Sequence, residues 1–341
     1  RVLCSRAGIM IIKLPSGRLL VYNEKKTQEV PVMDVICVGE MLIDFTPGTQ
    51  PASYIRNPGG APANACIAMA RNGLEAGFLG KLGDDDFGRF LKETLEKDGV
   101  KVLCPKLTDE AITTLAFVTL YENGERSFTF ARKPGADMLL EVSDVKAEDI
   151  ENTRMLHAGS FGMSKDPSRT ATEYAMKLAK EKGKLVSYDV NYRDTVWENE
   201  AAAKEAVDSI LKYVDLLKIS EEELSFTGGE ENIPAFMKEN GITVVIETLG
   251  ADGAKYFFDG REGHICGHKV KAVDATGAGD AFWGGFLSKI LMSGVNTAAE
   301  LTEDIVKESL EYGNASGAIC VQKMGGIPAL PTKAEIEGYL D

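Results

Sequence analysis

The amino-acid sequence predicts a doubly wound α/β fold, in which helices flank a mostly parallel sheet and a small β-sheet forms a lid. Three observations predict it. Short apolar segments alternate with helical patterns from residue 34 onward, which is typical of βαβ units. Two segments with alternating apolar residues interrupt this pattern, as an antiparallel hairpin does. The 341 residues suit one large domain or two ordinary ones, and we find no linker between two domains.

Each element of the main domain follows from its local pattern. Short apolar runs bounded by turn residues predict six strands, at 35–38, 76–79, 155–158, 185–189, 216–219 and 244–248. Segments with apolar residues every three or four positions predict six helices, at 61–72, 87–98, 168–182, 199–213, 279–292 and 302–320.

The lid is expected to comprise about 42–56 and 110–132, because a small sheet that leaves the main domain often covers a site. Its hairpin turns at 122–125. Its strands are predicted at 42–45, 54–56, 112–121 and 126–131.

One face of the predicted hairpin carries two aromatic and two cationic side chains. Phe128 and Phe130 alternate with Thr129, and Arg126 and Arg132 share their face. This face either covers a ligand, which Phe130 and Arg132 would contact, or joins two copies of the chain into a homodimer.

Residues 1–33 do not match the alternating pattern, so the main domain is assigned to 34–341. Basic residues interrupt the apolar pieces of this extension, and it lacks the apolar core of a signal peptide. It is either an extra edge hairpin, formed by 9–14 and 19–22, or a segment foreign to the fold.

Composition narrows the class of partner. Asp and Glu number 52 against 38 Lys and Arg, a net charge of −14, which repels nucleic acids and anionic membranes. The apolar runs are much shorter than the roughly 18 residues that cross a membrane. The six cysteines lack metal or disulfide spacing, as in a reduced cytoplasmic protein. His264 and His268 complete no zinc pattern.

A glycine-rich turn, 274–280, leads directly into an apolar helix. The N–H groups of such a helix start favour an anion, and Gly277 and Gly279 let it approach the backbone. Asp280 on this turn could take a proton from a hydroxyl group. Alternatively, Asp280 only stabilises the helix start.

A second glycine turn opens the helix predicted at 61–72. Gly59 and Gly60 precede Pro62, which suits a first helical turn, and Asn64 offers both a donor and an acceptor. The turn either holds a polyol or is an ordinary junction between a loop and a helix.

Together the two turns resemble the signatures of the pfkB (ribokinase-like) family of carbohydrate kinases. The resemblance covers 34 to about 331 and implies a ribokinase-like fold that transfers a phosphoryl group from ATP, with Mg²⁺, to a sugar hydroxyl. It implies that Asp280 is the base. The implied anion hole is the backbone of Gly277, Ala278 and Gly279. The residues implied to grip the sugar are Asp44, Gly59, Gly60 and Asn64.

The resemblance also implies residues for the nucleotide and the ions. Ser220 and Glu223 occupy the place of the family's N-x-x-E element, and Glu223 would act on magnesium through water. A potassium ion would bind Asp274 and the Thr276 carbonyl. The implied nucleotide residues are Thr248, Gly250, Gly253, Asn314 and Gly317. A tight hairpin accounts equally well for Gly250 and Gly253.

The segment 189–193, followed by Trp197, resembles the D-P-N-Y-R…W stretch of the bacterial fructokinase branch, with Val190 in place of proline. The resemblance favours D-fructose as substrate. Arg193 either faces the sugar or the transferring phosphoryl group, or is a surface residue. A 2-keto-3-deoxygluconate kinase would need a carboxylate clamp, which Arg132 could supply. Ribokinase-type activity and a non-catalytic sugar- or nucleoside-binding protein are further alternatives.

Two other nucleotide-binding classes are excluded by their motifs. The first strand is followed by Val38-Gly39-Glu40-Met41 rather than the G-x-G-x-x-G of a dehydrogenase, and no G-K-[S/T] of a P-loop kinase occurs.

Overall fold

The computed structural model describes residues 2–6, 9–13, 19–23, 26–29, 33–50, 52–120 and 126–341. Its centre is a nine-stranded sheet with the order β17-β16-β15-β14-β13-β12-β5-β8-β9. Seven neighbouring strands are parallel, and β16 and β17 add an antiparallel edge. The strands are β5 (Met33–Val38), β8 (Ala76–Leu79), β9 (Lys101–Val102), β12 (Thr153–Gly159), β13 (Leu185–Asp189), β14 (Leu216–Ser220), β15 (Val244–Thr248), β16 (Ala254–Phe258) and β17 (Arg261–Ile265).

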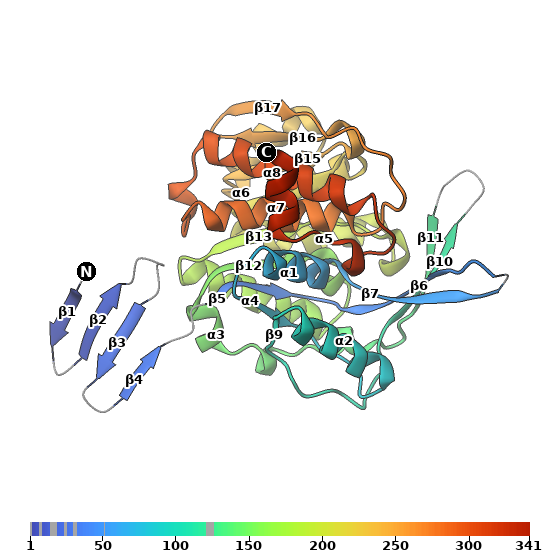
Figure 1. Ribbon diagram of the computed structural model, residues 1–341, viewed down its shortest axis with the longest axis horizontal. Helices are drawn as coiled ribbons and strands as arrows, with labels where there is room; N and C mark the ends of the chain where they lie inside the picture. Colours follow the sequence, from blue (N-terminus) through green and yellow to red (C-terminus); the bar gives the residue numbers. More distant parts are fainter. Residues whose placement is uncertain are drawn as a thin grey trace.

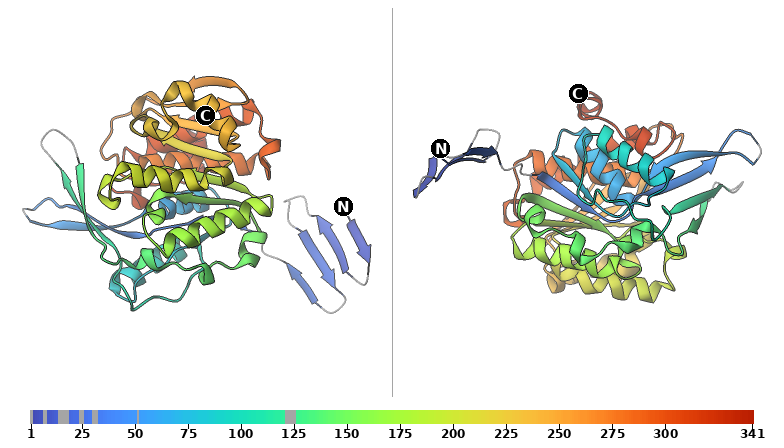
Figure 2. Two further views of the ribbon diagram at one scale, coloured as in Figure 1. Left: turned by 180° about the vertical axis from the view of Figure 1, so that it is seen from behind. Right: turned by 90° about the horizontal axis from the view of Figure 1, so that it is seen from below.

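Helices cover both faces of this sheet (Figures 1 and 2). One apolar core lies under α1 (Ala61–Arg71), α2 (Asp86–Lys97), α7 (Ala278–Met292) and α8 (Glu303–Cys320). A second core on the opposite face lies under α3 (Ala147–Glu151), α4 (Ser168–Glu181), α5 (Glu200–Ile210) and α6 (Ile233–Asn240). The last helix, α9 (Lys333–Leu340), packs against α8. The doubly wound fold, the six predicted strands and the six predicted helices are confirmed within one or two residues at most ends.

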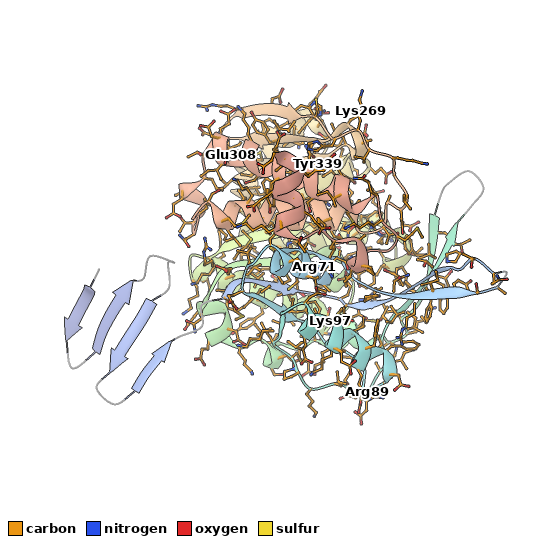
Figure 3. The ribbon with its side chains drawn as sticks, in the orientation of Figure 1. Arg71, Arg89, Lys97, Lys269, Glu308 and Tyr339 are labelled. Atoms are coloured by element: carbon orange, nitrogen blue, oxygen red, sulfur yellow. The ribbon has the colours of Figure 1, made fainter. Side chains whose placement is uncertain are left out.

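Arg71, the last residue of α1, attaches the segment 327–330 to this helix. Its guanidinium donates to the carbonyl oxygens of Ile327 and Leu330 at 2.8 and 2.7 Å and pairs with Asp98. Figure 3 labels it together with charged residues of the outer surface. No helix in the described ranges is long and apolar enough to cross a membrane.

The predicted lid is a separate four-stranded sheet with the order β11-β10-β6-β7. It projects from one side of the body in Figure 1. Its strands are β6 (Leu42–Pro47), β7 (Tyr54–Gly59), β10 (Leu115–Leu120) and β11 (Arg126–Ala131). Ala116 lies opposite both Asp44 and Phe130, so the two predicted site residues share one face of the lid. The hairpin pairing is confirmed, and its turn lies outside the described residues.

The extension forms a sheet of its own. Its four antiparallel strands are β1 (Val2–Arg6), β2 (Ile9–Lys13), β3 (Leu19–Asn23) and β4 (Lys26–Glu29). The predicted pairing of 9–14 with 19–22 is observed as β2 with β3, and the turn between them lies outside the described residues. The hairpin does not extend the central sheet, as an edge hairpin would.

Candidate active site

The first turn of α7 lies at the centre of the candidate site. Gly277 precedes the helix with a φ of 76°, a left-handed conformation that favours glycine. The N–H groups of this turn point out of the helix end, where they favour an anion. Ala278 donates its N–H to Ala275 O at 3.2 Å, so the predicted anion hole rests on Gly277 and Gly279. Asp280 lies on the same turn.

Close helix packing brings Asn64 to Asp280. Where α1 meets α7, a methyl group on Gly284 would lie 2.6 Å from the Ala68 Cβ, so glycine is needed for this approach. Asn64 Nδ2 donates to Asp280 Oδ2 at 2.7 Å, across 216 positions of sequence. Asn64 Oδ1 is buried and has no hydrogen-bond partner among the described residues, so it suits a hydroxyl group of a ligand.

The surroundings of Asp280 suit its predicted role as a base. Burial raises the pKa of Asp280 above its ordinary value, and the negative charge of Asp189 adds to this effect. The hydrogen bond from Asn64 and the positive charge of Lys218 oppose it. A carboxylate with a raised pKa abstracts a proton more readily than an exposed one.

A buried ion pair lies beside this turn. Asp189, the last residue of β13, lies opposite Lys218, which is two residues before the end of β14. Lys218 Nζ donates to both oxygens of Asp189 at 2.9 Å, and both side chains are buried. Gly279 lies close above the ammonium, since a Cβ there would be 3.8 Å from Nζ. Lys218 is not among the residues predicted from the sequence, although a lysine inside an apolar strand is a visible signal.

A column of polar side chains continues beneath the ion pair and joins the sheet to α7. His157 Nδ1 lies 3.0 Å from Ser187 Oγ, and Trp283 Nε1 donates to the same oxygen at 3.0 Å. Burial lowers the pKa of His157 to about 4, so the imidazole is neutral. These contacts fix the height of α7 above the strands that end at the site.

Glu223 ties two loops together at the same edge. Its two carboxylate oxygens accept the N–H groups of Ser220 at 2.8 Å and Tyr192 at 2.6 Å. Burial raises the pKa of Glu223, and Lys218 opposes the rise. Val190 donates its N–H to Lys218 O at 3.1 Å, which the proline of the family stretch cannot do.

The lid contributes Asp44. A Cβ on Gly59 would lie 2.0 Å from Asp44 Oδ2, so only glycine leaves room for this carboxylate. Burial raises the pKa of Asp44 to about 7, the charge of Asp280 adds to the rise, and Arg193 opposes it. Arg193 is exposed and donates to Tyr192 O at 2.8 Å. The predicted residues of the lid, α7 and the 189–193 loop therefore lie within electrostatic reach of one another.

A family model described as pfkB family carbohydrate kinase matches residues 32–333. The chain belongs to this family. A pfkB carbohydrate kinase is a phosphotransferase that acts on a sugar hydroxyl, and the recognition and fold predicted from the glycine turns are confirmed.

The relatives of this pfkB carbohydrate kinase include plant and bacterial proteins. Probable fructokinase-5 of Arabidopsis thaliana is 40% identical over 313 residues, which is 89% of this chain and 96% of that protein. Fructokinase of Xylella fastidiosa with bound ATP has a TM-score of 0.83 and 29% identity over 90% of this chain and 98% of its own. Fructokinase of Vibrio cholerae O395 with bound fructose, ADP and calcium has a TM-score of 0.81 and 33% identity, over 91% of this chain and 99% of its own.

The predicted nucleotide residues of the kinase lie near α7 or on the turn between β15 and β16. Thr248 ends β15 beside Ser220. Gly250 and Gly253 have φ of 57° and 97° in the hairpin that follows, so the hairpin explanation of these glycines is confirmed. Asn314 donates to the carbonyls of Ile265 and Cys266 at 3.2 Å. A Cβ on Gly317 would lie 3.4 Å from Ala278 O. Their contact with a nucleotide stays a prediction.

The loop before α7 is anchored by Asp274. Its Oδ1 accepts the N–H of Thr276 at 2.9 Å and the Thr276 hydroxyl at 2.7 Å, and its Oδ2 accepts the N–H of Gly325 at 2.9 Å. The loop is thereby held to the segment after α8. That Asp274 and the Thr276 carbonyl bind potassium stays a prediction.

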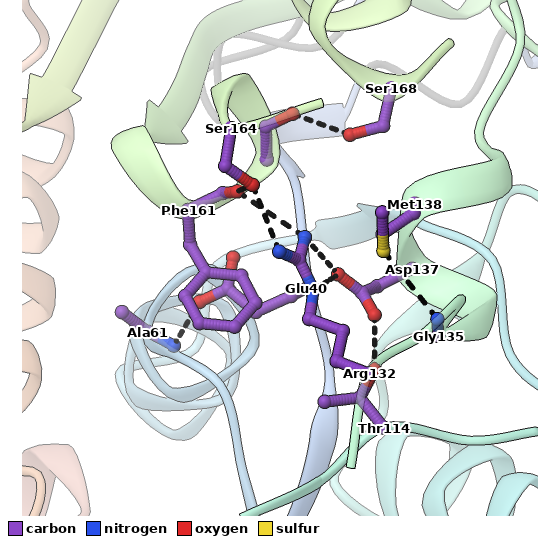
Figure 4. A network of polar contacts seen from close by, with 11 residues as sticks. Glu40, Ala61, Thr114, Arg132, Gly135, Asp137, Met138, Phe161, Ser164 and Ser168 are labelled. Carbon is purple, nitrogen blue, oxygen red and sulfur yellow. Dashed lines mark hydrogen bonds and ion pairs between the residues drawn. The ribbon is translucent and has the colours of Figure 1, made fainter. Parts of the chain in front are cut away.

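Arg132 requires a correction. Its guanidinium pairs with buried Asp137 at 2.6 Å, donates to Ser164 Oγ at 2.9 Å and lies 4.2 Å above the Phe161 ring (Figure 4). Only 7% of its side chain is exposed. The alternating pattern predicted the facing of side chains up to Ala131, where β11 ends. Arg132 comes one residue later, where the chain enters the body and Asp137 neutralises the guanidinium. Arg132 is therefore a buried structural residue rather than an open clamp for the sugar.

Phe130 keeps its place on the face of the lid that carries Asp44. Its ring packs beside Phe128 with a centroid distance of 6.1 Å and meets Phe161 edge-on at 5.5 Å. Phe161 follows β12 and sits on Arg132, so Phe130 joins the lid to the body. That it also covers the sugar stays a prediction.

We expect the KM for the sugar to rise as the pH falls below about 7. A carboxylate accepts hydrogen bonds at both oxygens only when ionised, and the pKa of Asp44 raised to about 7 means that a proton returns in this range. KM measured from about pH 5.5 to 8.5 checks this. The Asp44→Asn variant should have a higher KM without this pH dependence. A KM that stays constant in the wild-type enzyme would contradict the role of Asp44.

Proposed function

We propose that this protein is an ATP-dependent fructokinase, which transfers the γ-phosphoryl group of ATP to a hydroxyl of D-fructose. The proposal depends on one observation. Asn64 contacts Asp280 in the first turn of α7, and Asp44 of the lid lies within electrostatic reach of Asp280. A base, a hydroxyl-binding amide and an anion hole are the groups that this transfer needs.

The proposed mechanism uses these residues in turn. Asp44 and Asn64 hold the sugar so that its acceptor hydroxyl reaches Asp280, which takes the proton as the oxygen attacks the γ-phosphorus. The N–H groups of Gly277 and Gly279 stabilise the charge on the phosphoryl oxygens. Gly60 at the start of α1, and Gly59, keep the backbone close to the sugar. The lid excludes water, which would otherwise accept the phosphoryl group.

The charges at the site suit a divalent cation. Burial raises the pKa of Asp44, Glu223 and Asp280. The charge of Asp280 adds to the rise at Asp44, and that of Asp189 adds to it at Glu223 and Asp280, while Lys218 and Arg193 oppose these effects. Glu223 would hold Mg²⁺ through water, since each oxygen has a lone pair left. The ion would neutralise the charge on the phosphates. The Asp274 loop would hold potassium.

A neutral sugar fits the body of the site better than a sugar acid. The runner-up substrate, 2-keto-3-deoxygluconate, needs a cation for its carboxylate, and Asp137 and Ser164 already engage the guanidinium of Arg132. Arg193 is an exposed cation, and its charge already acts on the carboxylates of Asp44 and Asp280, which would repel the carboxylate of a sugar acid. The fructokinase names of the relatives agree with a neutral ketohexose.

Two further parts of the proposal concern the setting of the enzyme. The lid would also join two copies into a homodimer, because Tyr54 and Ile55 of β7 are about half exposed. We propose a cytoplasmic location from the cysteines, since Cys37, Cys66, Cys104, Cys266 and Cys320 are free thiols, and four of these five are buried.

A coupled ADP-release assay with Mg²⁺, potassium and ATP tests the proposal. The acceptors are fructose, ribose, 2-keto-3-deoxygluconate, tagatose, adenosine and none. We expect strong turnover with fructose and little without an acceptor. Turnover with another acceptor would contradict the choice of fructose, and sugar binding without turnover would favour the non-catalytic alternative.

A further inference from the structure

Lys218 is a charged residue in an unusual place. It lies on a strand of the central sheet with only 5% of its surface exposed, between the apolar residues Leu217 and Ile219. Moving an ammonium out of water is costly, and a pair of apolar residues often stabilises a core as well as a buried ion pair does. The stability of the fold alone therefore does not explain why a cation stands here.

The position of the ammonium explains it better. Parallel strands present their carboxyl ends to the ligand. Asp189 is the last residue of β13, and Lys218 pairs with it two residues before the end of β14. Nζ reaches the underside of the first turn of α7, where the missing side chain of Gly279 leaves it 3.8 Å from the place a Cβ would take. The cation thus lies next to the N–H groups that form the predicted anion hole.

The hydrogen bonds of Lys218 leave it a donor for a ligand. An ammonium has three N–H groups, and Asp189 accepts two hydrogen bonds from Nζ at 2.9 Å. Among the described residues, Lys218 Nζ makes hydrogen bonds to Asp189 alone, so its third N–H group has no acceptor there. Burial disfavours the charged form, but the charges of Asp189, Glu223 and Asp280 outweigh it and raise the pKa of Lys218. The group is a permanent cation.

We propose that Lys218 is a catalytic residue whose ammonium contacts the phosphoryl group during transfer, while Asp189 holds the ammonium in place. The inference rests on the proposed phosphoryl transfer. In that step the bond from the γ-phosphorus to the bridging oxygen of ADP breaks, and a bond to the sugar oxygen forms. The sugar proton goes to Asp280, and Lys218 neither gains nor loses a proton. Its charge offsets the negative charge that the phosphoryl oxygens bring to a site rich in carboxylates.

The first experiment separates this role from a structural one. Lys218→Met should lower kcat by about 10²- to 10³-fold with little change in the KM for fructose, and Lys218→Arg should restore part of the loss. Because Lys218→Met strands the Asp189 charge, the double variant Asp189→Asn/Lys218→Met is measured beside it. The double variant should have a urea midpoint close to that of the wild type, but its kcat should stay as low as that of Lys218→Met. Regained turnover in the double variant would overturn the proposal.

Lys180→Met is the matched control. Lys180 pairs with the largely buried Asp215 at 2.5 Å. Asp215 directly precedes β14, so this pair lies at the amino ends of the strands, opposite the candidate site. This variant also breaks a Lys–Asp pair beside β14. It should lower the urea midpoint and leave kcat unchanged.

A binding measurement tests the contact without any sugar. Lys218→Met should bind the magnesium complex of β,γ-imido-ATP at least about tenfold more weakly than the wild type, and ADP within about threefold. Equal weakening of the two nucleotides would overturn the proposal. If the wild type phosphorylates no sugar of the panel but the variant still discriminates between the nucleotides, the fructokinase proposal fails and the role of Lys218 stands.

Discussion

Replacement of Asp280 by asparagine is expected to lower kcat by about 10²- to 10⁴-fold, the usual contribution of a general base. Asparagine has nearly the same shape, so the chain should fold and bind sugar nearly as before. It cannot take a proton from the acceptor hydroxyl, and the raised pKa that suits Asp280 to this task is lost with the carboxyl group. Steady-state ADP release with saturating fructose and ATP measures the effect.

Asp304→Asn is the control for this variant. Asp304 lies in the first turn of α8, is exposed and is placed at its helix start much as Asp280 is at the start of α7. If Asp280 only stabilised its helix, the two variants would behave alike, with a small loss of stability and normal turnover. Normal turnover in Asp280→Asn would therefore remove it from the role of base.

Replacement of Arg132 by methionine is expected to lower the free energy of unfolding by about 3 to 5 kcal/mol, because it leaves the carboxylate of Asp137 buried without its cation. Thr114 and Arg132 are the two side chains that donate to Asp137 in Figure 4. Glu40 lies nearby, and burial raises its pKa to about 8, with Asp137 adding to the rise. Urea denaturation followed by circular dichroism gives the free energy.

Two comparisons make the result of Arg132→Met decisive. The double variant Arg132→Met/Asp137→Asn removes both charges and should recover most of the loss. Arg89→Met breaks ion pairs that are largely exposed, with Asp84 and Asp86, and should leave the urea midpoint unchanged. If Arg132→Met kept full stability but raised the KM for sugar, Arg132 would be the sugar ligand that the sequence suggested.

The sequence predicted the architecture well where one residue pattern determines one element. Buried strands such as β8 are apolar throughout, and helices such as α7 follow directly from a glycine turn. β17 was missed because its residues, Arg-Glu-Gly-His-Ile, are mostly polar at an exposed edge. β9 has two residues, too few for a periodic pattern.

The site was predicted to the extent that motifs mark it. Asp280 and Asn64 belong to the two glycine turns, and the family resemblance adds Asp44. The structure joins Asn64 to Asp280 and places Asp44 within electrostatic reach of Asp280, while their roles stay predictions. The role of Lys218 depends on the register of β13 and β14, which a single sequence does not contain. The partner of Arg132 depends on the path of the chain after β11, where Asp137 turns into the body.

The distance of 216 positions between Asn64 and Asp280 has a consequence for the synthesis of the protein. The predicted base, Asp280, and the helix start that would hold the phosphoryl group belong to α7, so they leave the ribosome only after most of the domain has been made. Folding must then join α1 to α7 in the same layer, a contact of long sequence separation, and contacts of this kind form slowly. A chain truncated before α7 lacks Asp280 and the Gly277 turn, so we expect it to transfer no phosphoryl group.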